Sequence, residues 1–292
     1  MVGLFGFYLA WADKLLEFCL MTAIDYLLIG HITRDVMSDG YMPGGTVTYS
    51  GRVAAALGCH TAVLTSAAAN EEGLAILDGL EWVNIPAAHT TTFENVYTAD
   101  GRIQTIHTIA EPLTVNHLPD DWQHPGIVHL APIINEVDVN FVYQLPDALI
   151  GLTPQGWLRD WGDDGRITPG KWKAAADILP LADVVILSPE DLPNTATLWQ
   201  YWELCKLLIL TAGPHGCIVI QGEGATRVPG IPVEEVDPTG AGDIFATAYL
   251  IRYHQTGDPL DAAHFANAVA AHSVGTVGID IEGIQSLVKN YE

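Results

Sequence analysis

The chain has 292 residues, which is enough for one large α/β domain or two modest ones with a substantial core. Its 12 Lys and Arg residues against 35 Asp and Glu residues give a formal net charge of −23, which disfavours partners that are themselves anionic, such as nucleic acids and membrane surfaces. Hydrophobic residues make up 49% and charged residues 16% of the chain, a balance that excludes a disordered acidic tail.

The first twenty residues contain an apolar stretch that Asp13, Lys14 and Glu17 interrupt before it reaches membrane-spanning length. This stretch has neither a basic start nor a small-residue cleavage site, so we expect no signal peptide. Met21 stands just before a strong strand pattern. We therefore expect residues 1–22 to be an extension, arising either from a mis-set start or from an amphipathic helix docked on the main domain at 23–292.

From residue 24 onward, predicted strands and helices alternate. Residues 24–29 form an apolar run, with Asp25 as its one charged residue, that ends at Gly30, which is typical of a buried parallel strand. A helix is predicted over 46–57 and a strand over 62–64. This alternation favours an α/β fold with a doubly wound, mostly parallel sheet covered by helices on both faces. Further strands are predicted at 127–130, 147–151, 183–187, 207–211 and 217–220.

A different pattern interrupts the alternation between residues 90 and 107. Two segments of mixed polar and apolar residues flank Asp100-Gly101, which is a strong signal for a hairpin turn. Because a hairpin inserted into an α/β body often acts as a flap or an interface, we expect a lid at this place.

Motifs for several other chemistries are missing from the sequence. There is no GxxxxGK[ST] phosphate loop, and Gly30 is not followed by the further glycines of a dinucleotide-binding turn. The 11 histidines lack the spacing of zinc ligands. The spacing of the four cysteines fits neither a metal site nor a disulfide framework. We therefore expect a cytoplasmic protein in which these residues are reduced thiols. They are Cys19, Cys59, Cys205 and Cys217.

The segment 236–250 carries the clearest chemical signal. Pro238 and two glycines prevent regular structure up to about residue 241, and a helical apolar pattern follows. Gly240, Ala241 and Gly242 are thereby placed at a helix N-terminus, whose amides can stabilise the charge on a phosphoryl group. Asp243 in the first turn is a candidate base for an attacking hydroxyl. The alternative is that Asp243 only offsets the helix dipole, although this would not need the Gly-Ala-Gly run before it.

The string DPTGAGD at 237–243, followed by a helix of small residues, resembles the C-terminal signature of the PfkB/ribokinase carbohydrate kinases. The resemblance extends from residue 24 to about residue 285. It implies a ribokinase-like fold with a small β-hairpin lid, whose elements are expected near 33–46 and 90–108.

On the acceptor side, the resemblance implies that Asp35 holds substrate hydroxyls and that Gly44 and Gly45 let a polyol touch the backbone. Family members usually carry Asn where Tyr49 stands here. This departure, together with the lid string around Asn95, is more similar to the myo-inositol kinase branch than to ribokinase itself, and Asn95 is therefore a predicted acceptor contact.

On the donor side, the resemblance implies an ATP site and a Mg²⁺ ion. Asp191 stands where the family has Glu, and we expect it to orient magnesium-bound water. Asp237 is similar to residues around the family's monovalent-cation site, which implies K⁺ as a further ion. The position of Arg159 leaves open whether it lies near the phosphates or on the surface. The predicted ATP contacts are Ser188, where the family has Asn, and Thr211, Gly213, Gly216 and Asn267.

The resemblance implies an ATP-dependent kinase that phosphorylates a hydroxyl of a small sugar or polyol, with myo-inositol as one candidate. A ribokinase-, fructokinase- or nucleoside-kinase-like activity stays open, as does a non-catalytic ligand-binding protein of the same fold. We expect no nucleic-acid or membrane partner. The lid could also pair between subunits to form a homodimer.

Overall fold

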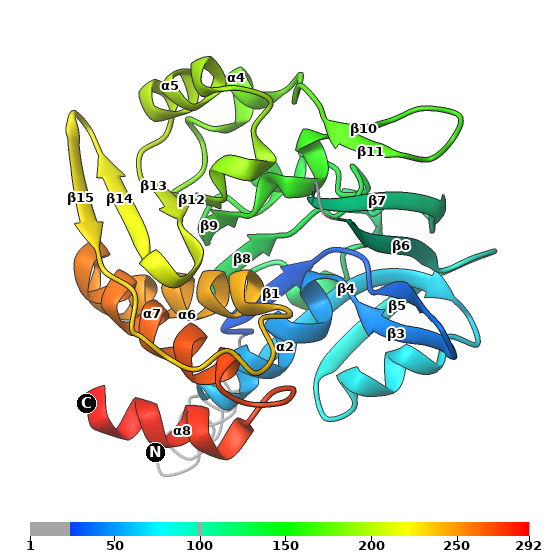
Figure 1. Cartoon of the computed structure of the whole chain (residues 1–292), viewed down its shortest axis with the longest axis horizontal. Helices are drawn as coiled ribbons and strands as arrows, with labels where there is room; N and C mark the ends of the chain where they lie inside the picture. The colour runs from blue at the N-terminus through cyan, green and yellow to red at the C-terminus, as the bar shows by residue number, and fades with distance from the viewer. Residues whose placement is uncertain (1–23, 99–100, 292) are drawn as a thin grey trace, which may run out of the picture.

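The computed structural model describes residues 24–98 and 101–291, so the extension expected at residues 1–22 lies outside the described residues. Nine strands form the main sheet in the order β15-β14-β13-β12-β9-β8-β1-β4-β5 (Figure 1). The strands from β13 to β5 are parallel to their neighbours, whereas β14 and β15 are antiparallel. The strand bounds are β1 Tyr26–Ile29, β4 Thr61–Ala68, β5 Glu81–Ala87, β8 Ile127–Leu130, β9 Leu149–Leu152, β12 Val184–Leu187, β13 Leu208–Thr211, β14 Cys217–Gln221 and β15 Gly224–Val228.

Helices cover both faces of this sheet. In Figure 1, α2, α6, α7 and α8 lie below the sheet, and α4 and α5 lie above it. The helix bounds are α2 Thr46–Ala56, α3 Phe141–Gln144, α4 Ala175–Ile178, α5 Thr195–Leu204, α6 Ala241–Thr256, α7 Pro259–Val274 and α8 Ile281–Tyr291. None of the helices in the described ranges is long and apolar enough to cross a membrane.

The alternation of side chains along β1 explains why the sheet has two cores. Tyr26 and Leu28 point to one face and pack with α2, α6 and α7, whereas Leu27 and Ile29 point to the other face. All four side chains are fully buried. A strand that is apolar on both sides has to be covered on both sides, which is why the continuous apolar run indicated a central parallel strand.

A second, four-stranded sheet lies at the right of Figure 1, in the order β3-β2-β6-β7. It consists of two hairpins joined by the parallel pair of β2 and β6. Because it lies beside the carboxyl ends of the main strands, we call it the lid sheet. Its strands are β2 Thr33–Met37, β3 Gly40–Gly44, β6 Thr91–Thr98 and β7 Gly101–Thr108.

A third, two-stranded element, β10 Arg159–Trp161 with β11 Ile167–Pro169, extends next to the lid sheet. Its turn is bound to β7, because the Ile106 N–H donates to the Gly165 carbonyl at 2.8 Å. None of the strands predicted from the sequence falls in this region.

The predicted α/β architecture, a mostly parallel sheet flanked by helices with a small lid, is confirmed. The helix expected at 46–57 and the strands expected at 127–130, 183–187 and 207–211 are present to within a residue at each end. The lid consists of two hairpins. Asp100-Gly101 indicated one of them, and the other, β2–β3, lies in the segment 33–46 where the family resemblance implied a lid element.

Candidate active site

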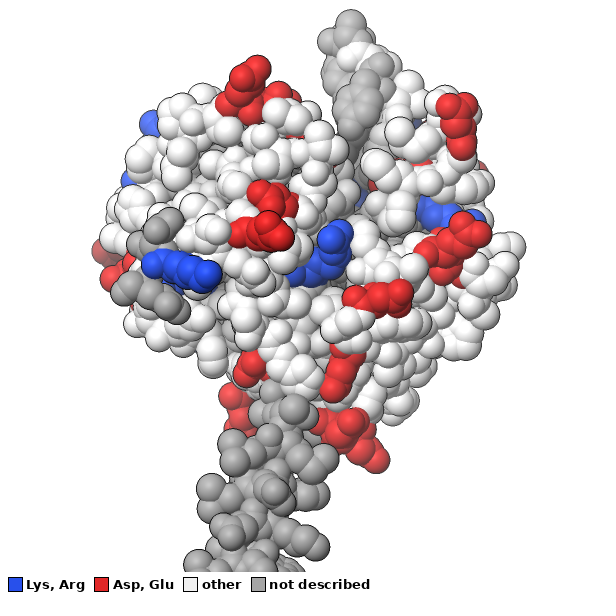
Figure 2. Space-filling model, turned by 90° about the horizontal axis from the view of Figure 1, so that it is seen from below, with Lys and Arg blue, Asp and Glu red and all other residues white. Residues whose placement is uncertain are grey.

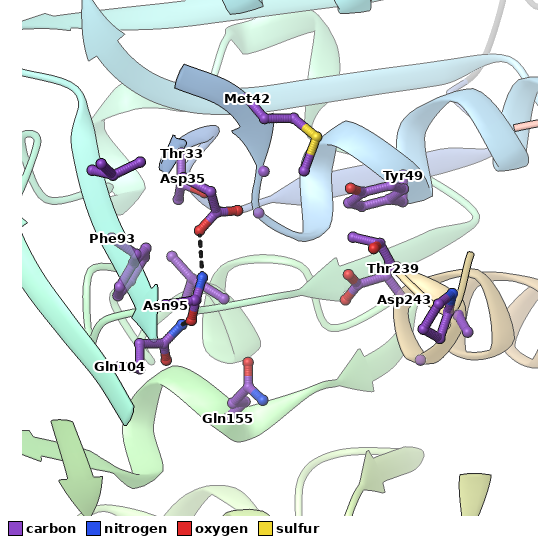
Figure 3. A pocket seen from close by; sticks show the side chains of 18 of the residues that line it. Thr33, Asp35, Met42, Tyr49, Phe93, Asn95, Gln104, Gln155, Thr239 and Asp243 are labelled. Atoms are coloured by element: carbon purple, nitrogen blue, oxygen red, sulfur yellow. Dashed lines mark hydrogen bonds between the residues drawn. The ribbon is translucent and has the colours of Figure 1, made fainter. Parts of the chain in front are cut away.

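A cavity of about 690 Å³ lies between the lid sheet and the first turns of α2 and α6. The lid sheet contributes one wall, with Asp35 and Asn95, and α6 contributes the opposite wall, with Asp243 (Figure 3). Gln155, from the segment after β9, points into the cavity between these walls. Residues that are more than a hundred positions apart in the sequence therefore share one cavity.

The lid wall holds its polar side chains in a chain of hydrogen bonds. The Asn95 amide donates to the Asp35 carboxylate at 2.9 Å, and the Gln104 amide donates to the Asn95 side-chain oxygen at 2.9 Å. The three residues come from β2, β6 and β7, so the pairing of the lid strands sets the position of the carboxylate. Asp35 and Asn95 thus meet as predicted, whereas Gln104 was not recognised from the sequence.

Gly44, the last residue of β3, and Gly45 after it allow the chain to pass close to this wall. A Cβ atom at Gly44 would collide with the Asp35 carboxylate, and one at Gly45 would collide with the His31 carbonyl. Gly45 also has a φ of 83°, which favours glycine. Both predicted positions therefore require glycine, and α2 can begin directly beside Asp35.

The opposite wall is the start of α6, as predicted. Gly240 is the N-cap, in the left-handed region with a φ of 75°, and a Cβ atom there would collide with the Tyr49 ring. The first amides of a helix have no partner within the helix and can bind an anion. In this helix the Ala241 N–H is already shared with the Pro238 carbonyl, at 3.2 Å.

Asp243 lies in the first turn of α6. Burial raises the pKa of its carboxyl to about 6, the Thr46 hydroxyl and the Arg159 guanidinium lower that pKa, and Asp191 raises it. A carboxylate with a pKa near 6 is ionised at neutral pH and still basic enough to take a proton. Thr46, the first residue of α2, was not predicted as a site residue, although it directly follows the two glycines.

Tyr49, one turn into α2, lines the cavity on the side of Asp243, and its ring packs against Gly240 (Figure 3). Burial raises the pKa of its phenol to about 12, and the charges of Asp243 and Asp35 contribute to the rise. The phenol is therefore neutral and able to donate a hydrogen bond at physiological pH.

The predicted nucleotide contacts lie outside the residues that line this cavity. Ser188 follows β12 and caps a short 3₁₀ helix, and Thr211 ends the neighbouring strand β13. Asn267 is buried on α7, where its amide donates to the Pro229 carbonyl at 3.2 Å. The structure thus places these residues along the carboxyl side of the sheet, beyond the start of α6. Gly213 and Gly216 form the turn between β13 and β14, both with positive φ.

The two predicted ion positions differ in how they are held. Both carboxylate oxygens of Asp191 accept hydrogen bonds, from Gln155 Nε2 at 2.9 Å and from the Ser188 N–H at 3.1 Å. The Asp237 carboxylate accepts from the Thr239 hydroxyl and N–H and from the Gly278 N–H, and these bonds lower its pKa. In the described part of the chain, no group of three or more His, Cys, Asp or Glu side chains could hold a metal ion.

Sequence comparison relates this chain to known kinases. Residues 172–284 match the profile of the pfkB family carbohydrate kinases. A cytidine kinase from Thermococcus kodakarensis is 24% identical over 256 residues, covering 82% of this chain and 91% of that protein. A probable fructokinase-5 from Arabidopsis thaliana is 38% identical over 106 residues, which is 33% of each chain.

Solved structures show the same fold. A pyrophosphate-dependent kinase in the ribokinase family, complexed with a pyrophosphate analog and myo-inositol, superimposes with a TM-score of 0.77 at 22% identity, over 89% of this chain and 99% of that chain. The ribokinase of Arabidopsis thaliana, complexed with ribose and ATP, gives a TM-score of 0.67 at 18% identity, over 92% and 99% of the two chains. Residues 172–284 therefore form a pfkB family carbohydrate kinase domain, as DPTGAGD predicted, and the related proteins are phosphotransferases with an alcohol group as acceptor.

Proposed function

We propose that this kinase transfers the γ-phosphoryl group of ATP to a hydroxyl of a small neutral sugar or polyol, with myo-inositol as the first candidate. The observation that carries the proposal is the cavity in which Asp243 and the amides at the start of α6 face Asp35 and Asn95. One wall offers acceptors and donors for hydroxyl groups, and the other offers a base beside an anion-binding helix end.

In the proposed reaction, Asp35 and Asn95 hold the acceptor, and Asp243 takes the proton of the attacking hydroxyl. The hydroxyl oxygen forms a bond to the terminal phosphorus, and the bond from that phosphorus to the bridging oxygen breaks, leaving its electron pair on the ADP oxygen. Amides at the start of α6 stabilise the charge on the equatorial oxygens. The products are a phosphomonoester and ADP, and the proton leaves Asp243 to solvent.

The charge of the cavity supports a neutral acceptor. Asp35 and Asp243 line it from opposite walls, and the protein as a whole has a formal net charge of −23. An anionic acceptor would be repelled by both carboxylates, whereas hydroxyl groups can donate hydrogen bonds to them. Because one relative is a cytidine kinase, a nucleoside acceptor is a competing proposal that the experiment below includes.

Pyrophosphate is a second candidate for the donor. Two solved structures of pyrophosphate-dependent kinases share the fold at TM-scores of 0.76 and 0.77. The residues proposed for ATP lie outside the cavity, whereas the helix end that would take the transferred group lies inside it. A donor as small as pyrophosphate needs only the helix end that takes the transferred group.

The donor side also fits an indirectly held magnesium ion. A carboxylate has about four acceptor positions, and Asp191 uses two, so it can still bind a water molecule of a hydrated Mg²⁺. When bound, the ion would neutralise charge on the donor phosphates. For a monovalent cation such as K⁺, we propose Asp237, whose lowered pKa keeps it ionised.

The proposal includes a homodimer formed through the lid and a cytoplasmic location. Large apolar side chains are exposed on the lid strands and their turn, including Met37, Tyr41 and Val96, and a partner subunit would cover them. Cys59, Cys205 and Cys217 are unpaired, which suits a reducing compartment.

The test is product formation with two donors and a panel of acceptors. ATP and pyrophosphate would each be combined with myo-inositol, ribose, fructose and cytidine, with a blank without acceptor, and phosphorylated product would be measured directly. We expect turnover above the blank for one polyol or sugar. If cytidine were the only acceptor that gave turnover, the proposal of a sugar or polyol acceptor would be wrong. If pyrophosphate were the only donor that gave turnover, the proposal of ATP as the donor would be wrong.

A further inference from the structure

Arg159 stands out in the charge distribution of the active-site cavity. Among the described residues that line the cavity, it is the only one with a cationic side chain, and it shares the cavity with Asp35 and Asp243. Basic residues are scarce in this protein, with 12 Lys and Arg against 35 Asp and Glu. Figure 2 shows one face on which acidic side chains are widespread and basic ones are few.

The guanidinium is held by the main domain and by the lid at the same time. Its Nη1 donates to the Ile133 carbonyl, which follows β8, at 2.7 Å. Its Cζ lies 5.6 Å from the centroid of the Phe93 ring, which belongs to lid strand β6. Phe93 is 2% exposed and packs with Ile106 and Ile134, so its ring position is fixed by the lid core.

A further connection to the lid comes from the hairpin that Arg159 begins. The hairpin turn is bound to β7 through the Gly165 carbonyl and the Ile106 N–H. Gly165 has a φ of 71°, and a Cβ atom there would collide with the Ile106 carbonyl, so the turn lies directly against the lid strand. The backbone of Arg159 is thus tied to the same sheet that holds the acceptor residues.

We propose that Arg159 contacts the phosphoryl group during its transfer and that the lid, through Phe93 and the β10–β11 hairpin, sets the position of this arginine. The inference deepens the proposed function and rests on it. A phosphoryl group in transfer carries negative charge on its equatorial oxygens, and here it passes between two carboxylates that would repel it. The planar guanidinium has five N–H donors in a rigid fork, so it can hold a carbonyl and an anion together.

This arrangement makes catalysis depend on the lid. The lid residues that bind the acceptor and the lid residue that packs on Arg159 belong to one sheet. When that sheet is in place, the acceptor and the positive charge are both in place, whereas a displaced lid removes both. Such coupling would limit transfer of the phosphoryl group to water when no acceptor is bound.

Arg159 also acts on the base. Its charge lowers the pKa of Asp243, as described above. Without the guanidinium, that pKa rises, and the protein needs a higher pH before Asp243 is ionised. A residue that only supported the structure from a distance would leave the pH profile of kcat unchanged.

The experiment compares wild type with Arg159→Met, Arg159→Lys and Arg159→Ala, using the donor and acceptor that wild type accepts. Arg166→Met is the matched control, because Arg166 is exposed on the same hairpin and does not line the cavity. Melting temperatures of all variants would be recorded, and the lysine variant provides a second measurement if the methionine variant does not fold.

We expect Arg159→Met to lower kcat by about 100-fold or more, the size seen when one donor to a transition-state charge is removed, with the acceptor KM changed by less than about threefold. The acidic limb of the kcat profile should move to higher pH. Added guanidinium ions should restore part of the kcat of Arg159→Ala, and Arg159→Lys should lie between wild type and Arg159→Met. Arg166→Met should match wild type in all of these measurements.

The coupling to the lid has its own test. Phe93→Leu should lower kcat and shift the acidic limb in the same direction, and the double variant with Arg159→Met should be no worse than Arg159→Met alone. Additive losses would overturn the coupling. An active wild type whose Arg159→Met variant keeps its kcat and its acidic limb would overturn the role of Arg159 alone, whereas a wild type inactive with every donor and acceptor would overturn the proposed function and this inference with it.

Discussion

The proposed acceptor side and the proposed donor side are built in different ways. On the acceptor side, Asp35, Asn95 and Gln104 are joined side chain to side chain, and all three line the cavity. On the donor side, Ser188 and Thr211 bond mainly to nearby backbone atoms and lie outside the cavity. The proposed acceptor site is therefore formed by side chains that hold one another through hydrogen bonds, whereas the proposed donor site depends on backbone groups and glycines.

This difference shows where substitutions should have large effects. A pre-formed network of side chains gives specificity, and each member can be removed by a single mutation. Backbone amides cannot be removed in this way, so a donor site made from them tolerates changes in its side chains. The variants below test this contrast, in order of decreasing effect.

The largest effect is expected for Asp243→Asn, which keeps the shape of the side chain and removes the base. We expect kcat to fall by about 10²–10⁴-fold, the usual contribution of a general base. Wild-type kcat should fall as pH drops through about 6, the pKa of Asp243. The measurements are the pH profile of wild type and the kcat of the variant at pH 8.

The same substitution should stabilise the protein. Because the fold raises the pKa of Asp243 from 3.8 to about 6, the folded state favours the protonated form, and stability is lost as pH rises from 3.8 through 6. At pH 7 the variant should therefore gain up to about 3 kcal/mol in the free energy of unfolding, measured by urea titration.

Glu282→Gln is the control for the alternative role of Asp243. Glu282 is exposed in the first turn of α8, so it interacts with a helix dipole away from the cavity. This variant should keep full activity and lose about 0.3–1 kcal/mol of stability. If Asp243→Asn behaved in the same way, Asp243 would be a dipole residue and the assignment as base would be wrong.

The second prediction concerns Gly240→Ala. The added methyl group meets the Tyr49 ring, and the residue is held at a positive φ, so both the helix start and the tyrosine must shift. We expect kcat to fall by about 10–100-fold and stability to fall by about 1–3 kcal/mol. Steady-state kinetics and urea unfolding would measure the two losses.

The Tyr49→Ala background separates the two causes of that loss. In this background the clash between the added methyl group and the tyrosine ring is absent, whereas the backbone strain at residue 240 remains. Gly240→Ala should therefore lower kcat and stability less in Tyr49→Ala than in wild type. Gly242→Ala is the matched control for folding, because its added methyl group meets nothing within 4 Å and should leave stability unchanged. Equal losses with and without the tyrosine ring would mean that packing between α2 and α6 does not position the helix start.

The third prediction tests the acceptor network. Asp35→Asn should raise the acceptor KM by about 10–100-fold, because a hydrogen bond to a charged group contributes about 1.5–3 kcal/mol. Gln104→Ala acts one step away, through Asn95, and should raise KM by about threefold or less. The donor KM should stay constant in both variants, and a parallel rise in donor KM would show that the two sides are not separate.

The contrast also explains what could be predicted from the sequence. The turn proposed to bind the phosphoryl group could be predicted because its chemistry lies within seven consecutive residues, 237–243, and needs glycine at fixed places. Asp35, Gly44 and Gly45 were recognised through family resemblance, and the structure brings all three to the cavity. The central strands were recognised from apolar runs, which both cores require, whereas their order in the sheet was not predicted.

The residues that were missed depend on contacts between distant segments. Thr46 matters because α2 packs on α6, and Gln104 matters because of the register between β6 and β7. Neither position has an unusual residue type or spacing. The β10–β11 hairpin was missed because its strands have only three residues each, too few for a periodic pattern.

The smallest effects are expected on the donor side, at Ser188. Its hydroxyl accepts a hydrogen bond from the Glu190 N–H at 3.3 Å, and asparagine caps helices equally well. Ser188→Asn should therefore leave stability unchanged and lower the donor KM by about two- to threefold, because its longer amide extends further toward the phosphates. Ser188→Ala distinguishes the role of Ser188 as a helix cap from a role in binding the donor. It should lower stability by about 0.5–1 kcal/mol and change the donor KM by less than twofold. A tenfold or larger change in donor KM for either variant would mean that the donor site, like the acceptor site, is built from side chains, and the contrast between the two sides would be lost.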